Sequence, residues 1–144
     1  MRFVGAVLLV VLCGACAGGD LVSGDRRSIG TVTVVLAVTP AQARLGEPVR
    51  LTFRLSNDGG AKQTLTFPSA QKYDFLVSEN GRRIWRWSDG QAFAQNVTYE
   101  QIAPQATITY SENWTPQQTG SFKVSGAIEA QGFSGRFVGS VNVK

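Results

Sequence analysis

The chain of 144 residues contains no histidine and only two cysteines, Cys13 and Cys16. Without an imidazole it lacks the Ser-His-Asp and Cys-His catalytic centres and the histidine ligands of most zinc sites. We therefore expect no enzyme, no metal centre and no cofactor. Charged residues are also few, at 17%, and 14 Lys and Arg against 10 Asp and Glu leave a net charge of only +4. Because the basic residues stand singly or in pairs, we do not expect nucleic-acid binding.

A long apolar stretch occurs at the N-terminus. Arg2 precedes an apolar segment at 3–13, and small residues follow it. This arrangement is typical of a secretory signal, and the segment is shorter than the roughly 20 residues of a transmembrane helix. We expect residues 1–15 to be a signal peptide of the lipoprotein type.

Two processing outcomes are open at this signal. Gly14 and Ala15 directly before Cys16 resemble a bacterial lipobox, with Cys13 at the position where Leu is usual. Lipidation of Cys16 predicts a membrane-anchored lipoprotein of the bacterial cell envelope. The alternative is ordinary signal cleavage after Ala17, which predicts a secreted or periplasmic soluble protein. In both cases the mature chain forms no internal disulfide, so the fold must depend on its core.

The composition changes after the signal. Residues 16–29 contain mainly Gly, Ser, Asp and Arg with few apolar residues, which is typical of a flexible linker. We expect these residues to form a tether, and a single domain to occupy residues 30–144.

Apolar residues recur with period two through that domain. In the clearest segment Val49, Leu51, Phe53 and Leu55 alternate with Arg and Thr, which predicts a half-buried strand. Breakers such as Pro, Asn-Gly and Asp-Gly separate the segments. Nine strands of this kind predict an all-β fold, an immunoglobulin-like antiparallel β-sandwich of about 7–9 strands. The predicted strands are 31–39, 49–55, 63–67, 73–78, 83–87, 97–102, 107–114, 120–130 and 136–143.

One hairpin has a defined register. Asn80 and Gly81 form the strongest short hairpin signal, because a type I′ turn needs positive φ at both central residues. A two-residue loop places Leu76 opposite Trp85. A slip of one residue would reverse the faces. The register predicts one face with Tyr73, Phe75, Val77, Ile84 and Arg86, and an outer face with Asp74, Leu76, Ser78, Arg83, Trp85 and Trp87.

The middle third of the chain carries a distinctive set of residues, which includes Tyr-Asp-Phe at 73–75 and Trp-Arg-Trp-Ser at 85–88. The members of the set are Asn57, Phe67, Ser69, Gln71, Tyr73, Asp74, Phe75, Gly81, Trp85, Arg86, Trp87, Ser88, Phe93 and Gln95. In these residues the chain resembles the intracellular proteinase inhibitor family of the BsuPI type. The resemblance implies an immunoglobulin-like sandwich and an inhibitor of subtilisin-type serine proteases. Because this chain carries an export signal, we expect an extracytoplasmic protease as its partner.

An aromatic cluster around Trp85 and Trp87 is the candidate partner-binding site. Trp and Arg dominate the hot spots of protein interfaces. The alternative is that the rings cap the sandwich and stabilise the fold. Residues 88–91 are a candidate inhibitory loop or an ordinary Asp-Gly turn. The candidate partner-binding residues are Asp74, Trp85, Arg86, Trp87, Ser88, Asp89 and Phe93.

These observations predict a protein-binding β-sandwich of the cell envelope that inhibits subtilisin-type proteases. Two other functions are compatible with the same residues. One is a non-inhibitory structural or assembly module that docks envelope proteins through a strand edge. The other is a glycan-binding module that uses Trp85 and Trp87.

Overall fold

The computed structural model describes residues 22–144. These residues form strands and no helix, so the predicted all-β fold is confirmed. No helix that could cross a membrane is found in the described part of the chain. The predicted signal peptide and Cys16 lie outside the described residues. The strands are β1 (Ser23–Ile29), β2 (Val32–Thr39), β3 (Gln42–Ala43), β4 (Val49–Asn57), β5 (Gln63–Phe67), β6 (Tyr73–Glu79), β7 (Arg82–Arg86), β8 (Thr98–Ile102), β9 (Thr107–Trp114), β10 (Gly120–Ile128) and β11 (Phe137–Val143).

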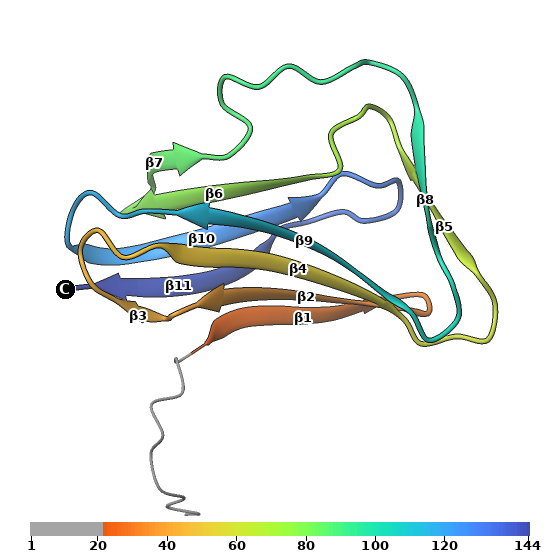
Figure 1. Cartoon of the computed structure of the whole chain (residues 1–144), viewed down its shortest axis with the longest axis horizontal. Helices are drawn as coiled ribbons and strands as arrows, with labels where there is room; N and C mark the ends of the chain where they lie inside the picture. The colour runs from red at the N-terminus through yellow and green to blue at the C-terminus, as the bar shows by residue number, and fades with distance from the viewer. Residues whose placement is uncertain (1–21) are drawn as a thin grey trace, which may run out of the picture.

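The strands build a sandwich of two sheets. One sheet has the order β1-β2-β4-β9, and the second has the order β3-β11-β10-β6-β7. Strands β5 and β8 pair with each other and stand across one end of the sandwich (Figure 1). The pairings are antiparallel except for β3, which runs parallel to β11. The inward residues of both sheets, alternating with polar ones, form a continuous apolar core.

All nine predicted segments are strands, and two further strands were not predicted. The pair Gln42–Ala43 is too short to show a period. The expectation of a flexible tether over 16–29 is wrong for β1, which pairs with β2 along Ser23–Ile29, so the domain begins before residue 30. Its inward side chains are mostly polar, and the sequence therefore lacks the apolar alternation that marks a strand.

Side chains of strand β1 connect the two sheets at one edge of the sandwich through hydrogen bonds to β11. Its inward residues Ser23 and Asp25 accept hydrogen bonds from the backbone N–H of Ser140 (2.9 Å) and Val138 (3.2 Å) on β11. Arg27 donates to the carbonyl of Arg136 and to Asp25. These bonds satisfy backbone groups of β11 where it has no neighbouring strand. Burial raises the pKa of Asp25, but the hydrogen bonds from Arg27 and Val138 outweigh it and hold this pKa below its usual value.

A glycine makes room at the centre of the core. The ring of Phe53 stacks on Phe75 at 5.2 Å and meets Phe137 edge-on at 5.4 Å. Gly126 on β10 lies under this ring, and a Cβ there would be 2.5 Å from the Cζ of Phe53. The close packing of the two sheets therefore requires glycine at this position.

Candidate functional site

The hairpin of β6 and β7 begins as predicted and then changes register. Asn80 and Gly81 have positive φ, 50° and 78°, and Glu79 faces Arg82 across the turn. A β-bulge follows, because Ile84 is an extra residue on β7. Val77 then faces Trp85, and Leu76 faces Arg86. The predicted pairing of Leu76 with Trp85 is therefore wrong by one residue.

Successive side chains of a strand point to opposite faces of the sheet. The one-residue shift at the bulge therefore reverses the predicted faces of β7. Trp85 and Trp87 are partly buried and pack against the core, as does Ile84. The expectation that both tryptophans lie on the outer face is wrong. Arg86 moves instead to the outer face, where it meets Asp74. The bulge thus creates the two contact sets that define the site.

The first set is a row of aromatic rings at the open side of the sandwich. Tyr73 stacks on Tyr110 of β9 at 4.8 Å and on Trp87 at 4.5 Å, and Trp87 meets Phe93 at 5.8 Å. The row fastens the segment after β7 to both sheets. Trp87 lies between two rings, an arrangement that disfavours stacking of a sugar on it.

Burial raises the pKa of both Tyr73 and Tyr110 well above the usual tyrosine value. The Tyr73 hydroxyl also donates a hydrogen bond of 2.5 Å to Oε1 of Glu112, which raises its pKa further. Among the described residues, the buried Tyr110 hydroxyl has no hydrogen-bond partner. Both phenols are therefore held neutral inside the site.

The second set centres on Asp74, which is 4% exposed. Its carboxylate accepts hydrogen bonds from Nε of Arg86 (2.7 Å), from Oγ and N of Ser88 (2.7 and 3.2 Å) and from N of Phe75 (2.9 Å). The hydrogen bond to Asp74 raises the pKa of Arg86, so the guanidinium stays charged. Asp74 is thus fully hydrogen-bonded and anchors the chain where β7 ends.

The segment between β7 and β8, residues 87–97, starts with a tight turn. Asp89 N donates to the Arg86 carbonyl at 3.3 Å, Gln91 N donates to the Ser88 carbonyl at 3.1 Å, and Gly90 has a φ of 76°. The side chain of Asp89 is exposed and lies 3.7 Å from Arg83. Residues 88–91 therefore have the geometry of an Asp-Gly turn, and not that of an extended segment.

The rest of the segment belongs to no sheet and bends at Asn96. Phe93 anchors it on Trp87, and Ala70 N donates to the Ala94 carbonyl at 2.9 Å. At the start, Gln91 Nε2 donates to the Trp87 carbonyl at 2.7 Å. These contacts fix the backbone of residues 91–97 and leave most of their side chains exposed.

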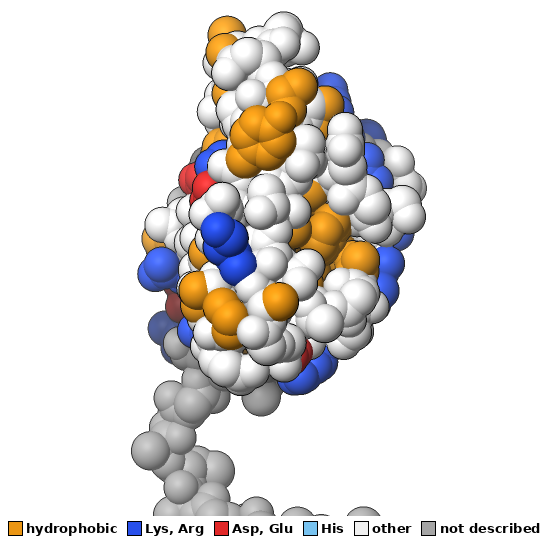
Figure 2. Space-filling view, turned by 90° about the vertical axis from the view of Figure 1, so that its right-hand side faces the viewer, with side chains coloured by type: hydrophobic (Ala, Val, Ile, Leu, Met, Phe, Trp, Pro, Cys, Tyr) orange, Lys and Arg blue, Asp and Glu red, His pale blue; other side chains and the backbone are white. Residues whose placement is uncertain are grey.

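This segment leads into exposed hydrophobic residues that sequence analysis missed. Val97 is 51% exposed and Tyr99 on β8 is 63% exposed. Figure 2 shows this end of the sandwich, where hydrophobic side chains lie on a surface of mainly uncharged groups. The alternation in β8 would have indicated Tyr99, because Ile102 is buried and residues of odd number must then face outward. We call residues 91–97 together with Tyr99 the contact loop.

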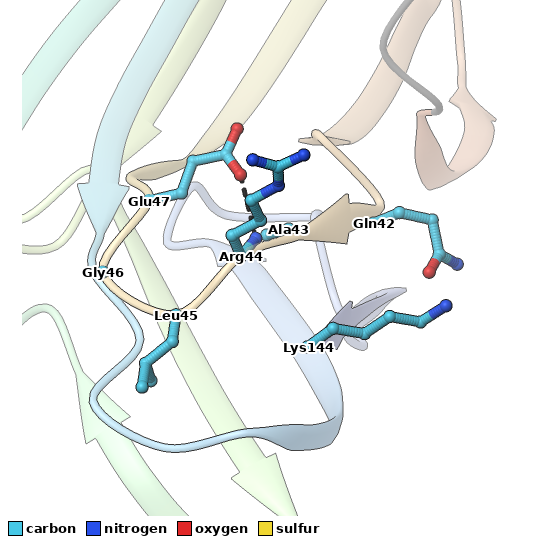
Figure 3. A pocket seen from close by; sticks show the side chains of 7 residues that line it. All are labelled: Gln42, Ala43, Arg44, Leu45, Gly46, Glu47 and Lys144. Atoms are coloured by element: carbon cyan, nitrogen blue, oxygen red, sulfur yellow. Dashed lines mark hydrogen bonds between the residues drawn. The ribbon is translucent and has the colours of Figure 1, made fainter.

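A separate hollow lies at the opposite end of the sandwich (Figure 3). It is lined by the turn after β3 and by Lys144. Arg44 N donates to Oε2 of Glu47 at 2.8 Å, and the side chains of Leu45 and Lys144 point in different directions. This open hollow shows no converging polar groups. No group of three or more metal-ligating side chains is found in residues 22–144.

Residues 36–133 match the family described as intracellular proteinase inhibitor, BsuPI. The chain belongs to the BsuPI family. No curated protein matches its sequence.

Solved structures with a similar fold have low sequence identity. The CARDB domain of a Pyrococcus furiosus protein has 16% identity and a TM-score of 0.45, and the match covers 91% of this chain and 99% of that one. Spo0M, a sporulation control protein from Bacillus subtilis, has 15% identity and a TM-score of 0.48, with 81% of this chain and 50% of that one covered. A β-glucosidase from Listeria innocua has 11% identity and a TM-score of 0.43, covering 78% of this chain and 16% of that one.

In this BsuPI chain the residues of the family's pattern gather around the contact loop. Tyr73, Trp87 and Phe93 form its aromatic support. Ser69 holds its far end, because its carbonyl accepts a 2.8 Å hydrogen bond from the Thr98 hydroxyl. The pattern therefore describes the support of the loop more than its exposed surface. The pattern residues with this role are Ser69, Tyr73, Asp74, Arg86, Trp87, Ser88, Phe93 and Gln95.

Asn57 is a pattern residue with a different position. It is fully buried at the end of β4, where Nδ2 donates to the carbonyls of Ala61 (2.8 Å) and Ile102 (3.0 Å). Its Oδ1 accepts from Gly59 N at 3.0 Å. Asn57 therefore ties the β4–β5 connection to β8, the strand that carries Tyr99.

Proposed function

We propose that the protein inhibits a serine protease of the subtilisin type, and that the contact loop is the surface that meets the protease. The observation that carries this proposal is the segment 91–97, which is exposed, lies outside any sheet and is anchored at both ends by half-buried groups. A protease cleft binds extended backbone, and a segment that is already ordered loses little conformational entropy when it binds. Membership of the BsuPI family supports the same function.

The exposed side chains of the loop suit a protein partner. Tyr99 offers a large rigid surface beside Val97, and Tyr is enriched among interface hot spots. We place six of the seven candidate residues of the sequence in two roles, while Trp85 lines a separate hollow beside Trp114. Asp74, Arg86 and Ser88 hold the loop, as do the rings of Trp87 and Phe93. Asp89 lies on the exposed turn.

Inhibition of subtilisin by the purified chain, measured as a dissociation constant, tests the proposal. We expect stoichiometric inhibition by the native chain. Tyr99→Ala should weaken binding at least ten-fold, since hot-spot truncations cost about 2 kcal/mol or more. The matched control is Leu45→Ala, which removes another exposed hydrophobic side chain (53%) at the opposite end of the sandwich and should leave inhibition unchanged.

Trp87→Ala tests the role of loop order separately. Without this ring Phe93 loses its support, and the loop should become flexible. A flexible loop is a substrate and not an inhibitor, so we expect cleavage within residues 88–97 by the same protease, while circular dichroism reports a folded sandwich. An intact domain that neither inhibits nor is cleaved in the loop would contradict the proposal.

We also propose that the protein is exported and anchored by a lipid on Cys16, which places its target outside the cytoplasm. The support is the signal-like sequence at 1–15. Cys16→Ser should release the protein from the membrane fraction of cells that express it. Membrane association that survives this change would count against the anchor, but it would not affect the inhibitor proposal.

A further inference from the structure

The outer face of the β1-β2-β4-β9 sheet carries three arginines and no acidic side chain. The strand registers align Arg26 with Val35, Val35 with Arg54, and Arg54 with Thr109, so two of the arginines stand in one row across the sheet. Arg50 lies four residues before Arg54 on β4 and points to the same side, as the burial pattern of β4 shows. The other outward residues of the four strands are Gly24, Ser28, Thr33, Ala37, Thr39, Thr52, Ser56, Thr107, Ser111 and Asn113.

None of the three arginines forms an ion pair with a described residue, whereas Arg27, Arg83 and Arg86 each lie against a carboxylate. Arg50 only donates a 2.8 Å hydrogen bond to the Ser111 hydroxyl. Asp25 on β1 and Glu112 on β9 point to the inner side of the sheet. Asp58, which follows β4, accepts a hydrogen bond from Thr33 at the end of the face. The face is therefore positively charged, and its other side chains are short.

We propose that this face, which we call the arginine face, docks on a bilayer surface that contains anionic phospholipid. Guanidinium groups bind phosphate in a bidentate manner. Short side chains between the arginines let the face approach a plane of headgroups closely. The proposal is independent of the contact loop, which lies on other strands, and it does not require the lipid on Cys16.

The path of the chain supports a membrane as the occupant. Strand β1 is an edge of the arginine face, and residues 16–23 span at most about 25 Å. A chain anchored at Cys16 therefore keeps this face near the headgroups. Strands β1 and β9 are the two opposite edges of this sheet. The contact loop leads into β8 on the side of the molecule away from β1 (Figure 1), so docking of the arginine face leaves the loop accessible.

Co-sedimentation of the purified full chain with vesicles tests the proposal. The chain carries Cys16→Ser, so that no lipid contributes. Vesicles of phosphatidylcholine are compared with vesicles of equimolar phosphatidylcholine and phosphatidylglycerol, and the readout is the ratio of the two affinities. The ratio cancels the partition of the apolar residues 3–13, which is similar for both vesicles.

We expect a clear preference for the anionic vesicles that weakens as salt is added. Each arginine near an anionic surface raises the affinity for it about five-fold. The combined variant R26Q/R50Q/R54Q should therefore lower the preference for anionic vesicles by roughly a hundred-fold. The control variant K62Q/R82Q/K123Q removes the same charge from other exposed positions and should retain most of the preference.

Two results would overturn the proposal. An equal loss of preference in both variants would show that net charge, and not the arginine face, attracts the bilayer. Duplex DNA that displaces the native chain from anionic vesicles, and does so through the same three arginines, would assign the face to a nucleic acid. Inhibition of subtilisin is measured on the same variants and should be unchanged, so the failure of one proposal is distinguishable from the failure of the other.

Discussion

Replacing Asp74 with alanine tests whether a buried carboxylate holds the contact loop in place. The change removes four hydrogen bonds, of which those from Arg86 and Ser88 join β6 to the end of β7 and to the segment that follows it. It also leaves the guanidinium of Arg86 without its partner. Both effects should make the loop more mobile and lower the free energy of unfolding of the whole domain.

The magnitude follows from burial. Removal of one partner from a fully buried ion pair costs about 3–5 kcal/mol. Asp74 is buried, but the Arg86 side chain is 39% exposed, so water compensates part of the loss. We expect Asp74→Ala to lower the free energy of unfolding by about 3 kcal/mol.

Urea unfolding measures this change, and a matched control is present in the same hairpin. Asp89 pairs with Arg83 at 3.7 Å, and both side chains are more than half exposed. Exposed ion pairs contribute little to stability, so Asp89→Ala should lower the free energy of unfolding by less than about 0.5 kcal/mol. A double-mutant cycle of Asp74→Ala with Arg86→Ala isolates the pair itself, and we expect a coupling of about 1–2 kcal/mol.

Limited proteolysis reports on the loop. If Asp74 fixes Ser88, a non-specific protease should cut residues 88–97 faster in Asp74→Ala than in the native chain, under conditions where both are folded. Equal costs for Asp74→Ala and Asp89→Ala, or a coupling near zero, would refute the argument that this carboxylate anchors the loop.

Two further predictions concern the core and the aromatic row. Gly126→Ala places a Cβ against the ring of Phe53 and should destabilise the fold by about 1–3 kcal/mol in urea unfolding, while Gly60→Ala, where the Cβ meets nothing within 4 Å, should not; equal effects would contradict the packing argument. The raised pKa values of Tyr73 and Tyr110 mean that the folded state holds their protons more tightly than the unfolded state, so their contribution to stability is complete below the ordinary tyrosine pKa of 10.0 and is lost as the pH rises beyond it. Absorbance titration should show both phenols ionising only as the domain unfolds; their ionisation near pH 10 in the folded state would refute the buried, neutral assignment.

The local pattern of the sequence determined the fold class and most of the strands. Alternation of apolar and polar residues, as in 49–55, is a property of neighbouring residues and can be read without knowing what packs against them. The turn at Asn80 and Gly81 was predictable for the same reason, because it depends on the φ that these two residues accept. The resemblance to the BsuPI family also rested on local motifs.

The tertiary structure decided the parts that depend on a distant partner. Strand β1 has inward side chains that bond to β11 more than a hundred residues away, so nothing in its own composition marks it as a strand. The bulge at Ile84 decided which faces Trp85 and Arg86 occupy. A bulge is stabilised by the sum of contacts on both faces, here the aromatic row on one and Asp74 on the other.

The same distinction applies to the two surfaces. The sequence placed the supporting residues of the contact loop in a motif, but not the exposed Val97 and Tyr99, because exposure depends on what the β5–β8 pair covers. Arg26 and Arg54 are far apart in the chain and show no charge run. Only the registers of β1, β2 and β4 bring them into one row, since strand pairing converts sequence distance into lateral neighbours.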